Sequence, residues 1–251
     1  MPSRTCDPVR QLFPVVRDPV DPADVYADVP IAADRPGVRL NMIASADGAT
    51  AVNGRSGALG GPADRTVFMA LRSLTDMILV AAGTARTEGY GPARLSESVQ
   101  AERGQRGQTP VPAIAVVTRT AALDWDSPFF TEATARPIVV TVSTSPNQSR
   151  ASEVADVVIA GDDDVDLRRA LDALAERGAR SVLAEGGPSL NAQLAGAGLL
   201  DELCLTLAPS LVGGDAKRIV SGPAFGARHE LRLISVCEED DFLFLRYGFR
   251  R

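Results

Sequence analysis

One stretch constrains the fold of this chain more than any other: an apolar run of strand length that ends in two glycines and a proline. The run covers Ser181–Ala184, and Glu185, Gly186 and Gly187 separate it from Pro188. Proline suits the first position of a helix, where its missing N–H costs nothing. We therefore predict a strand, a tight turn and a helix. The turn has two interpretations, a phosphate-binding helix N-terminus or an ordinary strand-to-helix connection.

Short apolar runs that end in polar or glycine-rich residues recur along the chain. Those of strand length are residues 38–44, 77–82, 113–117, 137–142, 154–160 and 201–208. Apolar residues at helical spacing follow Pro62 and again precede Gly178. Strands that alternate with helices or long crossovers predict an α/β fold with a mostly parallel central sheet flanked by helices. The alternation in residues 242–249 predicts a C-terminal antiparallel strand.

The remaining segments are predicted to be irregular. Residues 1–36, rich in Pro and Asp, are expected to form an extended N-terminal arm with one short helical turn, followed by a single domain over residues 37–251. Residues 86–91 and 96–109 are predicted loops, the second of them mobile. The run Asp162-Asp163-Asp164 is interpreted as helix-capping and solvated, because adjacent side chains cannot easily converge on one metal ion.

Charge and composition exclude several classes of function. The formal net charge is −6 and Lys217 is the only lysine, so no cluster of cations is available to follow a nucleic-acid backbone. Three widely spaced cysteines and one histidine argue against a zinc site, and we expect no bound metal. No apolar run is long enough for a membrane span and no secretory signal is evident, which predicts a cytoplasmic protein.

Polar residues just after the predicted strands indicate where a ligand would bind. Ser45–Gly48, Gly83–Thr84, Thr118–Arg119 and Glu185–Gly187 all occupy such positions. Because ligands bind at the carboxyl ends of the strands in an open α/β sheet, these segments predict a cleft for a long ligand such as a dinucleotide. No Gly-x-Gly-x-x-Gly follows the first core strand, so a standard Rossmann domain is not expected.

Individual residues at these positions keep two interpretations. Arg119 beside Thr118 either clamps a ribose 2′-phosphate or is a solvated loop arginine. Asp47 either holds a substrate amine or ribose hydroxyl, or simply precedes Gly48 in a turn. Glu185 either faces a substrate or is a turn residue.

Several motifs taken together resemble one family. Their order and spacing carry the resemblance, and they are Asn41–Gly48, Gly60–Arg65, Gly83–Thr84, Glu185–Pro188, Leu200–Leu203 and Ala208–Gly214. Over residues 38–249 the chain resembles the reductase domain of the bifunctional riboflavin-biosynthesis deaminase/reductase. That family has a dihydrofolate-reductase-like fold, which is the fold the resemblance implies here.

The resemblance implies NADPH as hydride donor and a pyrimidine substrate whose phosphorylated ribose is reduced to ribityl. The implied cofactor-binding residues are Ser45, Gly83, Thr84, Thr118, Arg119, Thr141, Gly186, Gly187, Pro188 and Ser189. The implied substrate-binding residues are Asn41, Asp47, Arg65, Glu88 and Arg94, of which Arg65 would contact the phosphate. Asp47 and Glu185 are the implied catalytic residues. A homodimer is the implied assembly.

Three departures from the family pattern keep the substrate open. Asn41 stands where a lysine is common, Glu88-Gly89-Tyr90 replaces an Asp-Asp-Pro loop, and Arg94 matches a substrate-binding arginine only loosely. The deaminase half, with its zinc signature, is absent from this sequence. A riboflavin-pathway reductase, a dihydrofolate or pterin reductase and a non-catalytic NADPH-binding protein all remain as hypotheses.

Overall fold

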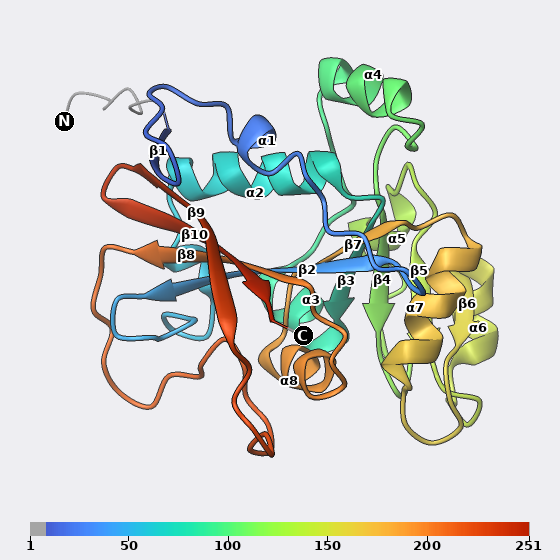
Figure 1. The fold of residues 1–251 in the computed structure, drawn as a ribbon. Helices are drawn as coiled ribbons and strands as arrows, with labels where there is room; N and C mark the ends of the chain where they lie inside the picture. Colours follow the sequence, from blue (N-terminus) through green and yellow to red (C-terminus); the bar gives the residue numbers. More distant parts are fainter. Residues whose placement is uncertain (1–8, 251) are drawn as a thin grey trace.

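A computed structural model describes residues 9–250 and shows one ten-stranded sheet with helices on both faces (Figure 1). The strands are β1 (Arg10–Phe13), β2 (Gly37–Ser45), β3 (Met77–Ala81), β4 (Ala113–Val117), β5 (Ile138–Thr141), β6 (Asp156–Ile159), β7 (Ser181–Ala184), β8 (Glu202–Ala208), β9 (Leu231–Glu239) and β10 (Phe242–Phe249). Their order is β1-β9-β10-β8-β2-β7-β3-β4-β5-β6. Strands β8 to β6 of this order are parallel neighbours, and β10, β9 and β1 continue the sheet by antiparallel pairing. The predicted mostly parallel α/β sheet with an antiparallel C-terminal strand is confirmed.

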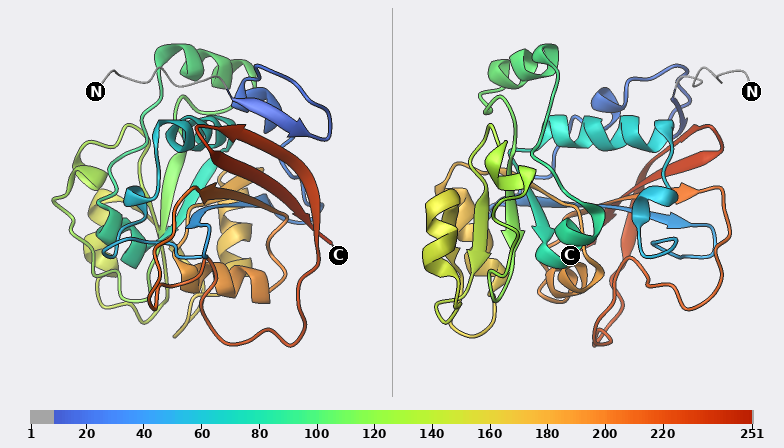
Figure 2. Two further views of the ribbon diagram at one scale, coloured as in Figure 1. Left: turned by 90° about the vertical axis from the view of Figure 1, so that its left-hand side faces the viewer. Right: turned by 180° about the vertical axis from the view of Figure 1, so that it is seen from behind.

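Helices pack on both faces because the buried strands are apolar on both sides. The helices are α1 (Pro22–Val25), α2 (Pro62–Leu74), α3 (Ala82–Glu88), α4 (Glu97–Gln105), α5 (Pro128–Thr131), α6 (Gln148–Val154), α7 (Leu167–Glu176) and α8 (Pro188–Gly196). In β3, Met77 and Leu79 belong to the core under α7 and α8, whereas Ile78 and Val80 belong to the core on the opposite face. Figures 1 and 2 show α2 and α8 on opposite sides of the sheet.

The N-terminal arm folds back onto the rest of the chain. Its residues 9–36 include β1, which pairs antiparallel with β9, and the short helix α1, which agrees with the expected helical turn. Val25 and Tyr26 are buried in the core beneath α2. Arg246 donates to the Val25 carbonyl at 2.9 Å and to the Asp28 carboxylate at 2.6 Å, which ties the arm to β10. The first eight residues of the predicted arm lie outside the described residues.

The predicted mobile loop over residues 96–109 was wrong, because this segment contains helix α4. Ser96 caps it by accepting from the Val99 N–H at 3.4 Å. The fully buried Arg103 then donates to the carbonyls of Ser73 and Thr75, at 2.9 and 2.7 Å, where helix α2 ends. Arg106, directly after α4, also donates to the Ser73 carbonyl at 2.9 Å. A polar helix is therefore held in place by guanidinium groups that satisfy carbonyl groups left free at a helix end.

The acidic run was also interpreted wrongly as helix-capping. Asp166 is the residue that caps α7, because its carboxylate accepts from the N–H groups of Arg168 and Arg169. Asp162 instead accepts from the Ser143 hydroxyl at 2.9 Å, and Asp164 pairs with Arg119 at 3.3 Å. The predicted irregular loop over residues 86–91 likewise begins inside α3, which Gly89 ends in the left-handed conformation. Among residues 9–250, no helix combines the length and apolarity that a bilayer crossing requires.

Candidate active-site cleft

The main cleft opens where the central strand β7 stops. Ala184, its last residue, pairs with Leu40 of β2, and β2 continues for five more residues beside β8 alone. Asn41, Met42 and Ile43 consequently face open space instead of a neighbouring strand. The cleft has a volume of about 1150 Å³, which suits a cofactor together with a substrate.

Most of the predicted site residues meet in this cleft. Those that line it are Asn41, Arg65, Gly83, Thr84, Glu88, Glu185, Gly186, Gly187, Pro188 and Ser189. Six predicted residues are not part of its lining, namely Ser45, Asp47, Arg94, Thr118, Arg119 and Thr141. The first group comes from β2, α2, α3, the turn before α8 and the first residues of α8. The topology therefore brings together residues that are up to 148 positions apart in the printed sequence.

Glu185 is held on the floor of the cleft by a network that the sequence did not indicate. Its side chain is 1% exposed, and Arg72 binds it with two hydrogen bonds of 2.7 and 2.6 Å. The Tyr90 hydroxyl donates to the same carboxylate at 2.8 Å. Burial, and then the Glu185 charge, raise the pKa of Tyr90 well above its ordinary value, so this hydroxyl keeps its proton. Burial by itself would lower the pKa of Arg72, because it disfavours the charged form. The Glu185 carboxylate outweighs this effect, so the pKa of Arg72 lies above its usual value.

The glycine turn after Glu185 has the geometry that a close backbone approach requires. Gly186 has φ +98°, which side-chain-bearing residues rarely adopt. A Cβ atom on Gly187 would lie 2.5 Å from the Thr84 Oγ1 atom. The first intrahelical bond of α8 runs from the Asn191 N–H to the Gly187 carbonyl at 2.9 Å, so the N–H groups of the helix's first turn face outward. Such a helix N-terminus favours a phosphate group.

The opposite wall of the cleft comes from the loop after β2 and from the start of α2. Glu88 accepts from the Ser56 N–H at 2.8 Å, which joins α3 to this wall. Arg65 lines the cleft from the first turns of α2, beside Asp64. Burial raises the pKa of the Asp64 carboxyl, and a hydrogen bond with Thr206 opposes that shift.

Ser45 ends β2, and Asp47 lies in the turn that follows it. The Ser45 hydroxyl donates to the Asp47 carboxylate, which also accepts from the Val212 and Gly213 N–H groups, the latter at 2.7 Å. Asp47 thereby joins the turn after β2 to the segment after β8. Asp47 is not part of the cleft lining, and the catalytic role that the resemblance implied for it stays a prediction.

The hydrogen bonds of Asp47 predict a measurable acid titration. The Ser45 hydroxyl, followed by the N–H groups of Gly213 and Val212, lowers the pKa of Asp47 to about 2. A lowered pKa means that the contribution of Asp47 to folding is present above about pH 4 and is lost as the pH falls through about 2. We expect the Gly213 amide proton resonance to stay constant from neutral pH down to about pH 3. A titration midpoint near pH 4, the ordinary value for aspartate, would contradict this contact.

Thr118, Arg119 and Thr141 lie together at the ends of β4 and β5. The Thr141 hydroxyl donates to the Arg119 carbonyl at 3.4 Å, and the buried Thr118 hydroxyl accepts from the Ala121 N–H at 3.1 Å. The Arg119 side chain is 68% exposed. Adjacent strands are about 5 Å apart, so β5 lies roughly 10 Å beyond β3 along this edge of the sheet. A dinucleotide is long enough to reach from the cleft to this point.

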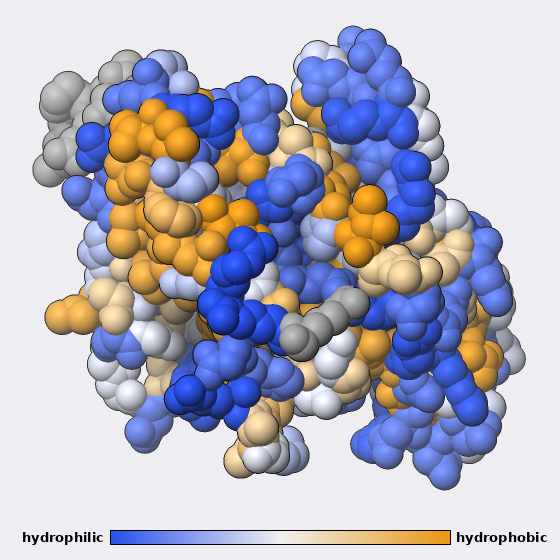
Figure 3. All heavy atoms as spheres, in the orientation of Figure 1, coloured by the Kyte–Doolittle hydropathy of each residue, from blue (hydrophilic) through white to orange (hydrophobic). Residues whose placement is uncertain are grey.

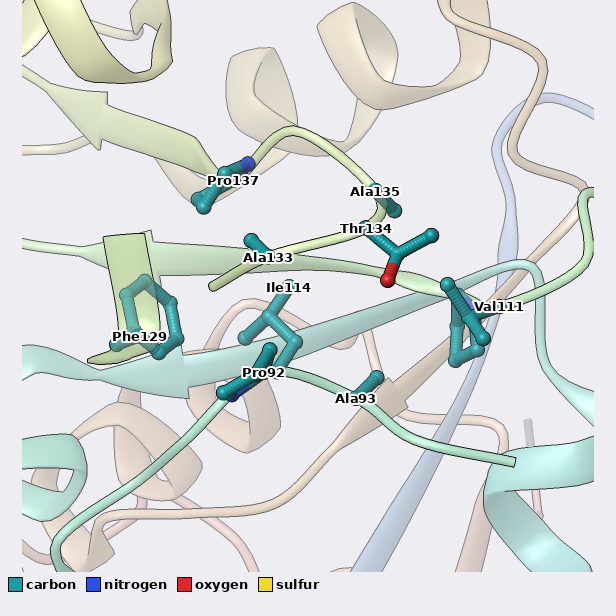
Figure 4. A pocket seen from close by; sticks show the side chains of 10 residues that line it. Pro92, Ala93, Val111, Ile114, Phe129, Ala133, Thr134, Ala135 and Pro137 are labelled. Atoms are coloured by element: carbon teal, nitrogen blue, oxygen red, sulfur yellow. The ribbon is translucent and has the colours of Figure 1, made fainter. Parts of the chain in front are cut away.

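Arg94 lies elsewhere, in a solvent-exposed ion pair with Glu132 at 2.6 Å. A second hollow nearby is lined by Pro92, Ala93, Val111 and Phe129, among other small or apolar residues (Figure 4). Its volume of about 10 Å³ is too small for any substrate, so it is a packing defect of the core beneath α5. Within residues 9–250, no three His, Cys, Asp or Glu side chains are grouped closely enough to hold a metal ion.

Sequence reasoning missed Tyr90 and Lys217, which line the cleft, and Arg72, which binds the Glu185 carboxylate. Nothing in the sequence connected Arg72 with Glu185. Tyr90 was seen only as part of a departure from a family motif. Lys217 was noted as the sole lysine, and this rarity was the one signal that could have directed attention to it.

Comparisons with known proteins agree with this geometry. Residues 36–242 match the family described as the RibD C-terminal domain. The chain is 33% identical to the 2,5-diamino-6-ribosylamino-4(3H)-pyrimidinone 5′-phosphate reductase of Methanothermobacter thermautotrophicus, over 75% of this chain and 85% of that protein. Its identity to the Archaeoglobus fulgidus protein of the same name is 27%, over 76% and 89% respectively. A crystal structure of a pyrimidine reductase-like protein from Corynebacterium diphtheriae superposes with a TM-score of 0.79 and 26% identity, covering 92% of this chain and 99% of that one.

Proposed function

The chain belongs to the RibD C-terminal domain family, and from that premise we propose that it is an NADPH-dependent reductase of a phosphorylated ribosylaminopyrimidine. The observation that carries the proposal is the cleft between β2 and β3, where the Gly186–Gly187 turn opens onto the N-terminus of α8. The absence of side chains at this turn and the outward N–H groups of the helix suit the pyrophosphate of a dinucleotide. Thr84 flanks the same turn.

The bound cofactor would supply a hydride, and the residues of the chain would hold the substrate in line with it. In the expected reaction, hydride adds to C1′ of the ring-opened imine and a proton adds to the nitrogen, which gives the ribitylamine. Glu185 presents a carboxylate fixed by Arg72 and Tyr90 on the cleft floor, where it can accept hydrogen bonds from the amino groups of the pyrimidine. Arg65 offers a cation to the phosphate of the substrate.

A panel of substrates tests the proposal directly. Purified protein and NADPH are mixed with 2,5-diamino-6-ribosylamino-4(3H)-pyrimidinone 5′-phosphate, with its 2-oxo counterpart 5-amino-6-(5-phosphoribosylamino)uracil, and with dihydrofolate, and the loss of NADPH absorbance is followed. Turnover of either phosphorylated pyrimidine supports the proposal, and the curated relatives favour the diamino compound. Turnover of dihydrofolate alone would make the chain a pterin reductase. NADPH binding without any turnover would make it a non-catalytic binding protein.

Arg119 is proposed to contact the 2′-phosphate that distinguishes NADPH from NADH. Replacing it with alanine removes a charge-assisted hydrogen bond worth about 1.5–3 kcal/mol, so the dissociation constant of NADPH should rise roughly 10- to 150-fold. The dissociation constant of NADH should stay within about twofold. Fluorescence titration with both nucleotides measures this, and equal losses for the two would contradict the assignment.

Asp164 provides the matched control for this role. Its carboxylate pairs with Arg119 and would compete with a phosphate for the same guanidinium. Asp164→Asn should therefore lower the dissociation constant of NADPH and leave that of NADH unchanged. If Asp164→Asn weakens the binding of both nucleotides, the Arg119–Asp164 ion pair stabilises the loop and does not tune contact with the cofactor.

We also propose a homodimer, supported by an apolar surface on the antiparallel half of the sheet. Leu205 and Leu207 of β8 lie opposite Leu245 and Leu243 of β10, half-buried on the face away from α2. Figure 3 shows hydrophobic residues gathered over this part of the molecule. Large exposed apolar patches mark interaction sites in soluble proteins. Light scattering of the purified chain tests the proposal, and the mass of a single chain would refute it.

A further inference from the structure

We propose that Lys217 binds a phosphoryl group inside the cleft, and that the 209–222 segment exists to hold it there. The inference rests on the proposed function, because that reaction brings two phosphoryl-bearing ligands into one cleft. Lys217 is the only lysine of the chain and lines the cleft. It follows β8 in an irregular segment on which sequence reasoning placed no function.

The 209–222 segment is attached to the body of the protein at several separate points. In the first part of the segment, the Ser210 carbonyl accepts a hydrogen bond from the Ala46 N–H at 2.9 Å. The Val212 and Gly213 N–H groups donate to the Asp47 carboxylate. The Asp47 contact explains why an aspartate stands at the end of β2. Asp47 thus acts as a positioning residue for this segment.

The backbone of Lys217 is itself fixed by two hydrogen bonds from Thr50. The Thr50 N–H and hydroxyl both donate to the Lys217 carbonyl, at 3.1 and 2.9 Å. Two residues further on, the buried Asn191 of α8 donates to the Ile219 carbonyl at 2.7 Å. The Ser221 N–H then binds the Pro188 carbonyl at 3.0 Å, at the start of the same helix. Lys217 is therefore held between the loop after β2 and the N-terminus of α8.

The charges around the cleft explain why a cation is needed at this place. The protein carries a net charge of −6, yet the proposed ligands are polyanions. Among the described residues that line the cleft, Arg65 and Lys217 are the cations, and no salt bridge is observed for either. Arg72, behind the lining, is engaged by Glu185. An ammonium group on a flexible stem binds phosphate as a point charge. The ligand is either the cofactor's pyrophosphate or the substrate's 5′-phosphate, which share this chemistry.

The experiment compares Lys217→Ala with Arg218→Ala, which removes the same charge from the next residue, outside the cleft lining. We expect Lys217→Ala to raise either the dissociation constant of NADPH or the KM of the phosphorylated pyrimidine about tenfold or more. Lys217→Arg should restore most of the loss, and Arg218→Ala should change neither constant. A dephosphorylated substrate should show no difference between wild type and Lys217→Ala if the substrate's phosphate is the ligand.

Chemical labelling gives a readout that does not depend on turnover. An amine-acylating reagent can modify only Lys217 and the α-amino group, and intact-mass analysis of the Lys217→Arg variant reports the α-amino reaction alone. NADPH or inorganic pyrophosphate should slow the acylation of Lys217. If the wild type reduces no pyrimidine while this protection persists, the proposed function fails and the inference survives. If turnover occurs but Lys217→Ala alters neither constant and no ligand protects Lys217, the inference is overturned.

Discussion

Replacing Arg72 with methionine is expected to cost the fold about 3–5 kcal/mol, because it leaves the Glu185 carboxylate buried without its cation. Both side chains are well shielded from solvent, at 13% and 1% exposed. The Tyr90 hydroxyl would remain as a hydrogen-bond donor, but a neutral donor cannot compensate a buried charge. Urea unfolding at neutral pH measures the loss.

A double variant separates the charge effect from lost packing. Arg72→Met combined with Glu185→Gln removes both charges, so it should be more stable than Arg72→Met alone by most of that loss. Arg65→Met, on the same helix and two turns earlier, is the matched control and should change stability by no more than about 0.5 kcal/mol. If the double variant is as unstable as the single one, the cost comes from packing on Phe68 and Tyr90, which Arg72 also contacts.

Gly187→Ala is expected to weaken NADPH binding roughly 5- to 150-fold. The added Cβ would lie 2.5 Å from the Thr84 Oγ1 atom and 3.8 Å from the Ala81 Cβ atom. Relieving such an overlap costs about 1–3 kcal/mol, either by displacing the turn or by rotating Thr84. Both movements disturb the proposed pyrophosphate site. Equilibrium titration with NADPH measures the change, and thermal unfolding reports whether the fold persists.

Two variants make this result interpretable. Gly91→Ala adds a Cβ that meets nothing within 4 Å, so NADPH affinity should be unchanged. Adding Thr84→Ala to Gly187→Ala removes the clashing oxygen and should recover part of the affinity. Unchanged NADPH binding in Gly187→Ala itself would show that the cofactor does not contact this turn.

The sequence predicted the central part of the sheet well, because a strand that is buried on both faces is a continuous run of mostly apolar residues. Ala113–Val117 is apolar throughout and Ser181–Ala184 is apolar after Ser181, and the structure confirms them as β4 and β7 with the same bounds. Strand β9 was not predicted. Its buried positions include Ser235 and Glu239, so the side that faces the core is not apolar. Its place depends on pairing with β10 and β1.

The segments that sequence reasoning judged wrongly are those held by polar contacts across long distances in the chain. Helix α4 has no apolar stripe, and its position depends on Arg103 reaching the end of α2. The N-terminal arm becomes part of the core because β9 offers it an edge and because Arg246 of β10 and Arg39 of β2 bind its carbonyl groups. No local pattern reports such partners.

The sequence by itself determined the α/β class, the glycine turn before α8 and the family, since these depend on local periodicity, on backbone freedom and on motif order. Only the tertiary structure decided which polar residues act together. It joined Glu185 to Arg72 and Tyr90, linked Asp47 to N–H groups of the 209–222 segment, and brought Lys217 to the cleft. The physical reason is that an ion pair or a carbonyl contact stabilises through proximity in space, which is set by packing and leaves no regular spacing in the sequence.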